Sequence, residues 1–279
     1  MRTAKRTPRL VLAPIFWIFS ASLLVLTAVR PALAEFEIQE STIDEGEIQL
    51  QYRGAQHGGL PRGADDVDVL PDDEEAPLRQ SHEFEIQMSI TSHWLVAVTH
   101  GFDKLDNGDL NLTALEAESQ IELITLEGDG LGFAIQGGFE KAVAGARKTE
   151  PDDVHFGPIV ELAKSKFLLT LNPMFFKERG PLADQDGLGF EYGAQARYAL
   201  TSRLSLALES FGEIQDMADG TSFNEQEHSI GPAFYYTFGE ADEEAKKGAE
   251  LTVSFGGQFG LTDATSDAAL KVFIGYEFF

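Results

Sequence analysis

The feature that most constrains the fold is a long run in which every second residue is apolar. Between Leu188 and Leu200, Leu, Phe, Tyr or Ala occupies each even-numbered position, and Gly, Glu, Gln and Arg fill most positions between. Side chains of a β-strand point alternately to its two faces, whereas a helix would scatter these apolar residues around its circumference. The run therefore predicts a strand with one apolar and one polar face.

The same alternation recurs along the chain and defines about twelve runs in total. The other runs lie at 48–52, 84–90, 115–123, 133–139, 167–175, 204–208, 230–238, 251–259 and 270–278, and more weakly at Trp94–Phe102 and Val154–Leu162. Strands of soluble sandwiches average about five or six residues, and strands that span a bilayer need about 9–11. Most of these runs reach the longer value, which favours a barrel in a membrane.

The connections between the runs alternate in length. Long ones include Ala55–His82 and Gln215–Asn224, and short ones include Ser92-His93 and Thr201–Arg203; Gly239–Gly248 is a long exception on the short side. Long outer loops with short periplasmic turns are typical of outer-membrane barrels. We therefore expect an all-β fold, a closed antiparallel transmembrane β-barrel of about 12 strands, within about 10–14.

Two prolines fall inside predicted strands, in Gly157-Pro158 and Gly231-Pro232. Proline removes a donor from the hydrogen-bond ladder and usually marks an edge or a bulge. Because a closed barrel has no edge, we expect a β-bulge at each.

The N-terminus resembles an export signal. Met1–Arg9 is basic, Leu10–Val29 carries no charge, and Ala32 and Ala34 form an Ala-x-Ala cleavage site. This three-part pattern predicts a cleaved signal peptide at 1–34 and a barrel at 35–279, exported to the outer membrane. An uncleaved membrane anchor is the alternative, because the apolar run is long enough to span a bilayer.

The composition excludes several classes of function. The chain has 46 acidic and 21 basic residues, a formal net charge of −25, and no cysteine. Such an acidic surface repels phosphate backbones, so we expect no nucleic-acid partner. The lack of cysteine excludes disulfides, thiol nucleophiles and cysteine-based metal sites, and no cofactor is expected.

The C-terminal strand carries a family resemblance. Leu270–Phe279 looks like the closing strand of Gram-negative outer-membrane proteins, which ends in an aromatic residue, although the alternation here ends one residue early, at Phe278. The segments Gln226–Pro232 and Tyr198–Leu206 resemble the loosely defined family of phenol-degradation MetA-pathway and transporter-like barrels. This resemblance implies an outer-membrane location, and a closing strand that the assembly machinery reads.

The polar face of the strands would line the lumen of the barrel. The lumen-lining candidates are Glu85, Glu118, Glu191, Gln195, Arg197, Glu209, Glu227 and Lys271. Acidic residues dominate this face, with Arg197 and Lys271 as the chief bases, and acidic rings favour cations. We expect a narrow channel or transporter for small solutes with a cation-preferring lumen; the alternative is a non-conducting structural or surface-interaction barrel.

The first outer loop, near 55–82, is strongly acidic. The weak divalent-cation candidates in it are Asp65, Asp66, Asp68, Asp72 and Asp73. Their spacing is not that of an EF-hand loop. A solvated loop is the simpler interpretation; the alternative is weak Ca²⁺ or Mg²⁺ binding that bridges to lipopolysaccharide, which would join membrane lipid as a partner.

Two histidine pairs are candidate catalytic groups. Asp153-Val154-His155 has the Asp-x-His spacing of outer-membrane proteases, but no second acidic pair is identifiable. His228 and Ser229 are adjacent, so a strand points them to opposite faces, which argues against a lipase pair. An enzyme is therefore not expected, and a hydrolase at the rim is the remote alternative.

Overall fold

The structure is a computed structural model that describes residues 36–59, 78–105, 108–143, 152–180, 183, 187–218, 220, 222–242 and 247–279. The strands are β1 (Ile48–Gly58), β2 (Leu78–Thr91), β3 (Trp94–Leu105), β4 (Leu110–Ile124), β5 (Gly130–Ala142), β6 (Asp152–Lys164), β7 (Phe167–Arg179), β8 (Gly189–Ala199), β9 (Leu204–Ile214), β10 (Glu227–Asp242), β11 (Lys247–Gly260) and β12 (Ala268–Phe278). A single turn of 3₁₀ helix, η2, covers Phe223–Glu225. No helix within the described ranges is long and apolar enough to cross a membrane.

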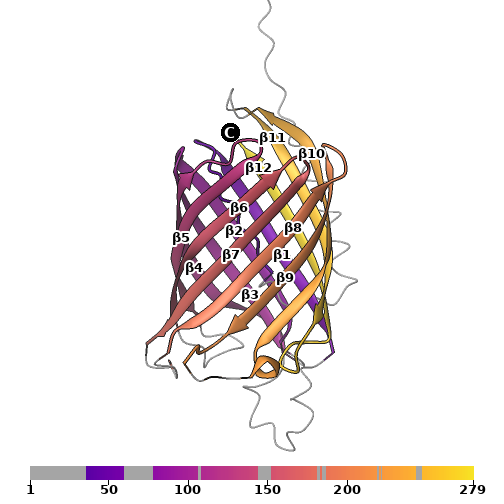
Figure 1. Ribbon diagram of the computed structural model, residues 1–279. Coiled ribbons are helices and arrows are strands. Elements are labelled where there is room, and N and C mark those ends of the chain that lie inside the picture. The colour runs from indigo at the N-terminus through magenta and orange to yellow at the C-terminus, as the bar shows by residue number, and fades with distance from the viewer. Residues whose placement is uncertain are drawn as a thin grey trace, which may run out of the picture.

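The twelve strands form one antiparallel sheet that closes on itself (Figure 1). β1 pairs with β12 along its whole length, from Ile48 opposite Phe278 to Gly58 opposite Ala268. On its other side β1 lies against β2, and Arg53 of β1 forms an ion pair with Glu83 of β2. The predicted all-β, closed antiparallel barrel of twelve strands is confirmed.

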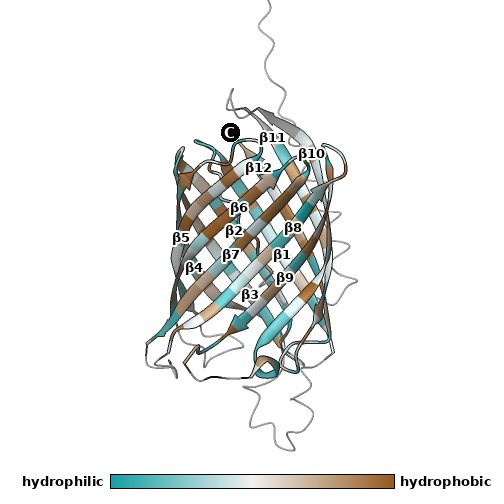
Figure 2. Cartoon of the chain, in the orientation of Figure 1, coloured by the Kyte–Doolittle hydropathy of each residue, from teal (hydrophilic) through white to brown (hydrophobic). Residues whose placement is uncertain are grey.

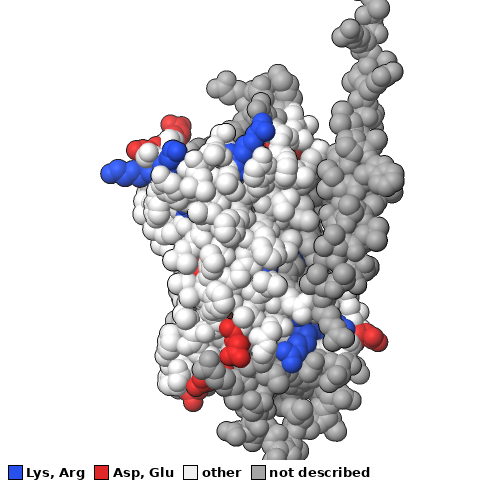
Figure 3. Space-filling view, turned by 90° about the vertical axis from the view of Figure 1, so that its right-hand side faces the viewer, with Lys and Arg blue, Asp and Glu red and all other residues white. Residues whose placement is uncertain are grey.

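Alternation along each strand separates an outer apolar face from an inner polar face. In β8, Tyr198 points outward and is 48% exposed, whereas Gln195 points inward and is 2% exposed. The outward side chains with large exposed surfaces include Phe84, Ile86, Val98, Ile121, Ile135, Phe156, Leu208, Phe234, Phe255 and Leu270. Figure 3 shows an uncharged band around the middle of one side of the barrel, with Lys, Arg, Asp and Glu gathered towards both ends, and Figure 2 shows the hydropathy along the strands.

The two ends of the barrel differ in their connections. We call the end that holds the C-terminus and the short connections, such as 92–93 and 165–166, the turn end, and the opposite end the loop end. At the turn end, β10 continues to Asp242 and β11 begins at Lys247, so the predicted ten-residue exception at 239–248 is mostly strand. At the loop end, β1 and β2 extend into the predicted 55–82 loop. The predicted signal peptide at 1–34 and the acidic residues of that loop lie outside the described residues.

The expected bulges at the two prolines are wrong. Pairing of β6 with β7 has the same register before and after Pro158, and so does pairing of β10 with β11 around Pro232. The preceding glycines explain this regularity. A Cβ on Gly157 would lie 2.0 Å from the carbonyl oxygen of Pro173, and one on Gly231 would lie 1.7 Å from that of Gly257. The neighbouring strand therefore approaches the glycine backbone closely, and the lost proline donor interrupts the ladder without shifting it.

Candidate functional site

The lumen contains the chain segment that precedes β1. Residues 36–47, here called the lumen segment, run inside the barrel from its loop-end half to the turn end, and a β-turn then leads into β1. The Glu47 amide donates to the Asp44 carbonyl (3.0 Å), and Gly46 adopts a φ of 86°, which glycine accepts without strain. Burial raises the pKa of Asp44, and the neighbouring Glu122 carboxylate raises it further.

Backbone groups of the lumen segment are hydrogen-bonded to side chains of the wall. Asn172 of β7 accepts from the Gln39 amide (2.9 Å) and donates to its carbonyl (3.0 Å). The backbone amide and the hydroxyl of Ser41 both donate to Oε2 of Glu161 on β6, at 2.8 and 2.6 Å. Gln120 of β4 donates to the Glu40 carbonyl at 3.0 Å. Several backbone polar groups of the segment are thereby satisfied by side chains of the wall, and Gly46 and Glu47 are hydrogen-bonded to the backbone of Ser89 on β2.

Charged contacts hold the same segment from other sides. Nη2 of Arg197 on β8 lies 2.6 Å from Oε1 of Glu40, and Nζ of Lys271 on β12 donates to the Phe36 carbonyl at 3.2 Å. The Phe36 ring packs on Phe211 of β9, with ring centroids 5.1 Å apart. Partners of the segment thus come from strands all around the barrel, which places it across the lumen.

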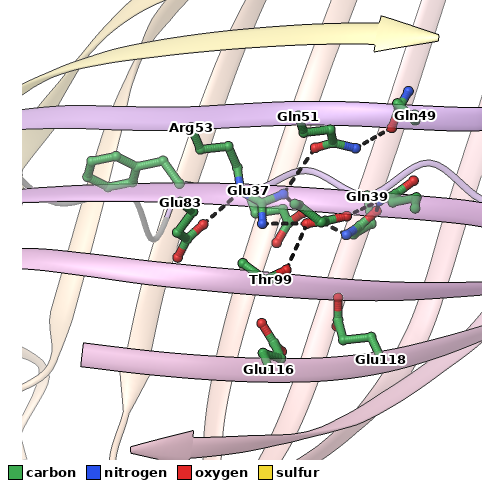
Figure 4. Close-up of polar contacts among 12 residues, drawn as sticks. Glu37, Gln39, Gln49, Gln51, Arg53, Glu83, Thr99, Glu116 and Glu118 are labelled. Atoms are coloured by element: carbon green, nitrogen blue, oxygen red, sulfur yellow. Dashed lines mark hydrogen bonds and ion pairs between the residues drawn. The ribbon is translucent and has the colours of Figure 1, made fainter. Parts of the chain in front are cut away.

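Arg53 is the centre of a buried acidic network between the wall and the lumen segment (Figure 4). Its guanidinium forms ion pairs with Glu37, with Glu83 at 2.7 Å and with Glu85 at 2.6 Å. Thr99 donates to the same Glu85 carboxylate at 3.3 Å. One arginine thus links the lumen segment to β1 and β2.

A second network surrounds Glu209 of β9. Lys271 donates to its Oε2 at 2.6 Å, Gln195 donates to its Oε1 at 2.8 Å, and the Tyr235 hydroxyl donates to the same Oε1. The Arg197 guanidinium lies 5.6 Å from the centre of the Tyr235 ring. Glu209 is fully buried, so its charge is held by a lysine and two neutral donors.

The structure brings some predicted lumen residues together and separates others. Gln195, Glu209 and Lys271 share the second network, and Glu85 belongs to the Arg53 network. Glu118 lies beside His155 on the inner face of the barrel, with β5 between their strands. Glu191 and Glu227 lie on inward positions near the loop end with exposed side chains. The predicted loop ligands Asp65, Asp66, Asp68, Asp72 and Asp73 lie outside the described residues.

Several inward residues were not predicted from the sequence. Arg53 is an inward base that the sequence interpretation missed, although it lies one position after outward Tyr52 and alternation places it on the polar face. The lumen segment was also missed. Its apolar alternation covers only Phe36 and Ile38, which is too short to separate it from a loop.

The two histidine pairs differ in their surroundings. His155 lies beside Asp153 and, across β5, beside Glu116 and Glu118, so a second acidic pair does exist, on β4. His228 instead stacks on Phe223 (4.6 Å between ring centroids), and its Nδ1 lies 3.1 Å from the Tyr192 hydroxyl. His228 therefore lies among aromatic neighbours.

A small cavity lies between the lumen segment and the wall. Gln39, Gln87, Glu118 and Gln136 are among the side chains that line a cavity of about 10 Å³ there. Such a volume holds about one water molecule.

Comparison with known proteins gives no family for this chain. No protein-family model and no curated protein matches the sequence. Among solved structures, the chain is similar to the KdgM porin in complex with disordered oligogalacturonate (6% identity, TM-score 0.48, 84% of this chain and 98% of that one). It is also similar to Omp33 of Acinetobacter baumannii (10%, 0.39, 86% and 99%) and to outer membrane phospholipase A of Escherichia coli (9%, 0.41, 86% and 99%). The barrel fold of this chain therefore rests on its own strand pairing.

Proposed function

We propose that this protein is an outer-membrane channel for small solutes, with an acidic, cation-preferring lumen that the lumen segment closes in the conformation described here. The observation that carries the proposal is the placement of residues 36–47 across a lumen lined by charged and amide side chains. The finer resemblance to MetA-pathway barrels is compatible with this assignment.

The outer surface supports a membrane location. Apolar side chains such as Ile86, Phe156, Phe234 and Phe255 are 53–57% exposed. Soluble proteins rarely expose a continuous apolar surface as large as this band. A closed barrel pairs every backbone group internally, as a lipid environment requires. Lipid and lipopolysaccharide would contact this band, and the assembly machinery would bind the C-terminal strand.

The contacts of the lumen segment favour a removable plug. Most of them are hydrogen bonds to polar or charged side chains, and each contributes about 0.5–1.5 kcal/mol net, or about 1.5–3 kcal/mol where one partner is charged, because water can replace it. The wall groups left behind, such as Asn172, Glu161 and Gln120, are polar and would be hydrated in an open pore. A wall built only to pack against the segment would have been apolar.

The second candidate is the non-conducting structural barrel. The same networks favour it, because Arg53 and Glu209 are fully engaged within the lumen. The two candidates predict opposite results when the segment is removed.

The deciding experiment is conductance in planar bilayers. The refolded full-length protein should open rarely, and a variant that lacks residues 36–43 but retains the turn at 44–47 should pass a steady current. Asn172→Ala and Gln120→Ala, which each remove contacts to the segment, should raise the opening frequency. Gln258→Ala is the matched control, because Gln258 is a buried inward amide whose side chain makes no hydrogen bond among the described residues. A folded deletion variant that passes no current at any voltage would establish the non-conducting barrel.

A further inference from the structure

Four side chains from two strands meet in the loop-end half of the lumen. His155 and Asp153 lie on β6, and Glu116 and Glu118 lie on β4, with β5 between them. Register explains the meeting: Glu118 is opposite Gly138 of β5, and Gly138 is opposite His155 of β6. The three positions form one row across the inner wall.

Gly138 gives the histidine its reach. A Cβ at this position would lie 2.5 Å from Nε2 of His155 and 2.9 Å from Cγ of Glu118. Any other residue would therefore block the path of the imidazole across β5. With glycine there, the ring extends over the strand to the carboxylates of β4.

The Nε2 atom of His155 is directed into a carboxylate pair without a hydrogen bond. The residue is 7% exposed, and Nε2 is a buried nitrogen that forms no hydrogen bond of acceptable geometry. Yet it lies 3.1 Å from Oε1 of Glu116 and 3.4 Å from Oε1 of Glu118. A buried nitrogen in this position is satisfied either as an imidazolium paired with the two carboxylates or by a cation that binds all three groups.

These distances match the edges of a metal coordination shell. One ligand atom from each of Glu116, Glu118 and His155 lies within 4.8 Å of the others. Two ligands bound tetrahedrally at about 2.0–2.1 Å lie about 3.3–3.4 Å apart. The observed separations of Nε2 from the two oxygens are within a few tenths of an ångström of that value.

Asp153 supplies the outer partner that such a histidine needs. Its Oδ1 lies 3.1 Å from Nδ1 of His155. A histidine that binds a metal through Nε2 usually donates its Nδ1–H to a carboxylate, which fixes the tautomer and orients the ring. The Asp-x-His spacing noted in the sequence thus has a structural role beside the two glutamates.

The local charge also favours a cation. Glu116, Glu118 and Asp153 surround one imidazole, and Glu140 and Glu191 lie nearby: Glu140 is opposite Asp153, and Glu191 interacts electrostatically with His155. An imidazolium would offset one of these negative charges, whereas a divalent ion offsets two and leaves the imidazole neutral.

We propose that Glu116, Glu118 and His155 bind a divalent transition-metal ion, with Asp153 positioning the histidine. Imidazole and carboxylate together suit ions such as Zn²⁺, whereas Ca²⁺ and Mg²⁺ prefer oxygen ligands alone. The exposed side chain of Glu191 shows that water reaches this part of the lumen, which leaves an open coordination position for solvent.

The test is Zn²⁺ titration of the full-length protein, refolded in detergent micelles after chelator treatment, by isothermal calorimetry. We expect one tight site per chain. His155→Gln and the double variant Glu116→Gln/Glu118→Gln should abolish it, and Asp153→Asn should weaken the affinity by about 10–100-fold. Mg²⁺ at the same concentration should not compete.

Two controls separate this site from other Zn²⁺ binding. His82→Gln removes a different imidazole, one on the outer face of β2 whose Nδ1 lies 2.7 Å from the Tyr52 hydroxyl, and should leave the site intact. Replacing Asp65, Asp66, Asp68, Asp72 and Asp73 by asparagine tests the acidic loop. Heat-modified migration on SDS gels checks that each variant is folded. Three results would each overturn the proposal. They are a wild-type protein that binds no Zn²⁺, a folded His155→Gln variant that still binds it, and binding that is lost only when the loop aspartates are replaced. None of these measurements depends on conductance.

Discussion

The guanidinium of Arg53 and the carboxylate of Glu37 form an ion pair that joins the wall of the barrel to the segment inside it. The Arg53 side chain is only 6% exposed, and two further carboxylates, those of Glu83 and Glu85, share its guanidinium. The same residue therefore contributes both to folding and to closure of the lumen.

Removing this arginine should destabilise the barrel strongly. Arg53→Met leaves Glu37, Glu83 and Glu85 without their cation, and breaking a buried ion pair in this way costs about 3–5 kcal/mol. Arg197→Met is the matched control. In its ion pair with Glu40, the side chain of Arg197 is 22% exposed and that of Glu40 is 56% exposed, and such exposed pairs contribute about 0–1 kcal/mol. Urea unfolding of the proteins in lipid vesicles measures both. Equal losses would mean that water screens the Arg53 network as well.

The alternation of the strands predicts that the outer face tolerates an introduced charge far less than the inner face. Phe234→Arg places a charge on an outward side chain that is 53% exposed in the middle of β10, which should cost about 2–4 kcal/mol in a bilayer. Glu191→Arg places the same charge on the inward face, beside other carboxylates. Folded yield, read from heat-modified migration, should fall for the first and stay near wild type for the second. Equal yields would show that the faces are misassigned.

Close approach of the backbone makes Gly231 irreplaceable. A Cβ there would lie 1.7 Å from the carbonyl oxygen of Gly257, so Gly231→Ala must push β10 and β11 apart. Overpacking of this kind costs about 1–3 kcal/mol or more. Gly58→Ala is the control, because the nearest atom to a Cβ there is 3.9 Å away. Urea unfolding compares the two variants, and a Gly231→Ala protein as stable as the control would contradict the close contact.

Local alternation was enough to predict the strands and the faces of most of them. Gln195, Glu209 and Tyr198 are examples, because each side follows from position parity within one run. The Arg53–Glu37 pair could not be predicted in this way, since nothing local places residues 36–47 inside the barrel. The meeting of Glu118 with His155 depends on the register of two strand pairs, which one sequence does not reveal. The prediction of bulges at the two prolines was wrong because the adjacent glycines accommodate the neighbouring backbone.

The charge of the lumen predicts cation selectivity in the variant that lacks residues 36–43. Under a KCl gradient its reversal potential should favour K⁺, since acidic groups such as Glu118 and Glu191 would remain on the inner face. The preference should fall with salt, because the Debye length shrinks from about 30 Å at 0.01 M to about 3 Å at 1 M. Glu191→Gln should reduce it, whereas Glu225→Gln, on the exposed η2 turn, should not. Anion selectivity would contradict the acidic lumen.

The metal site and the channel make one joint prediction. In the open deletion variant, Zn²⁺ bound by Glu116, Glu118 and His155 would place a fixed divalent charge on the inner wall, which should lower K⁺ current. A chelator should restore the current, and addition of His155→Gln to the deletion should remove the Zn²⁺ effect. His82→Gln in the same background should keep the effect. Bilayer current at fixed voltage with and without Zn²⁺ is the measurement. A Zn²⁺ block that persists without His155 would place the blocking ion elsewhere. If a variant binds Zn²⁺ by calorimetry but shows no block, the site lies beside the ion path rather than in it.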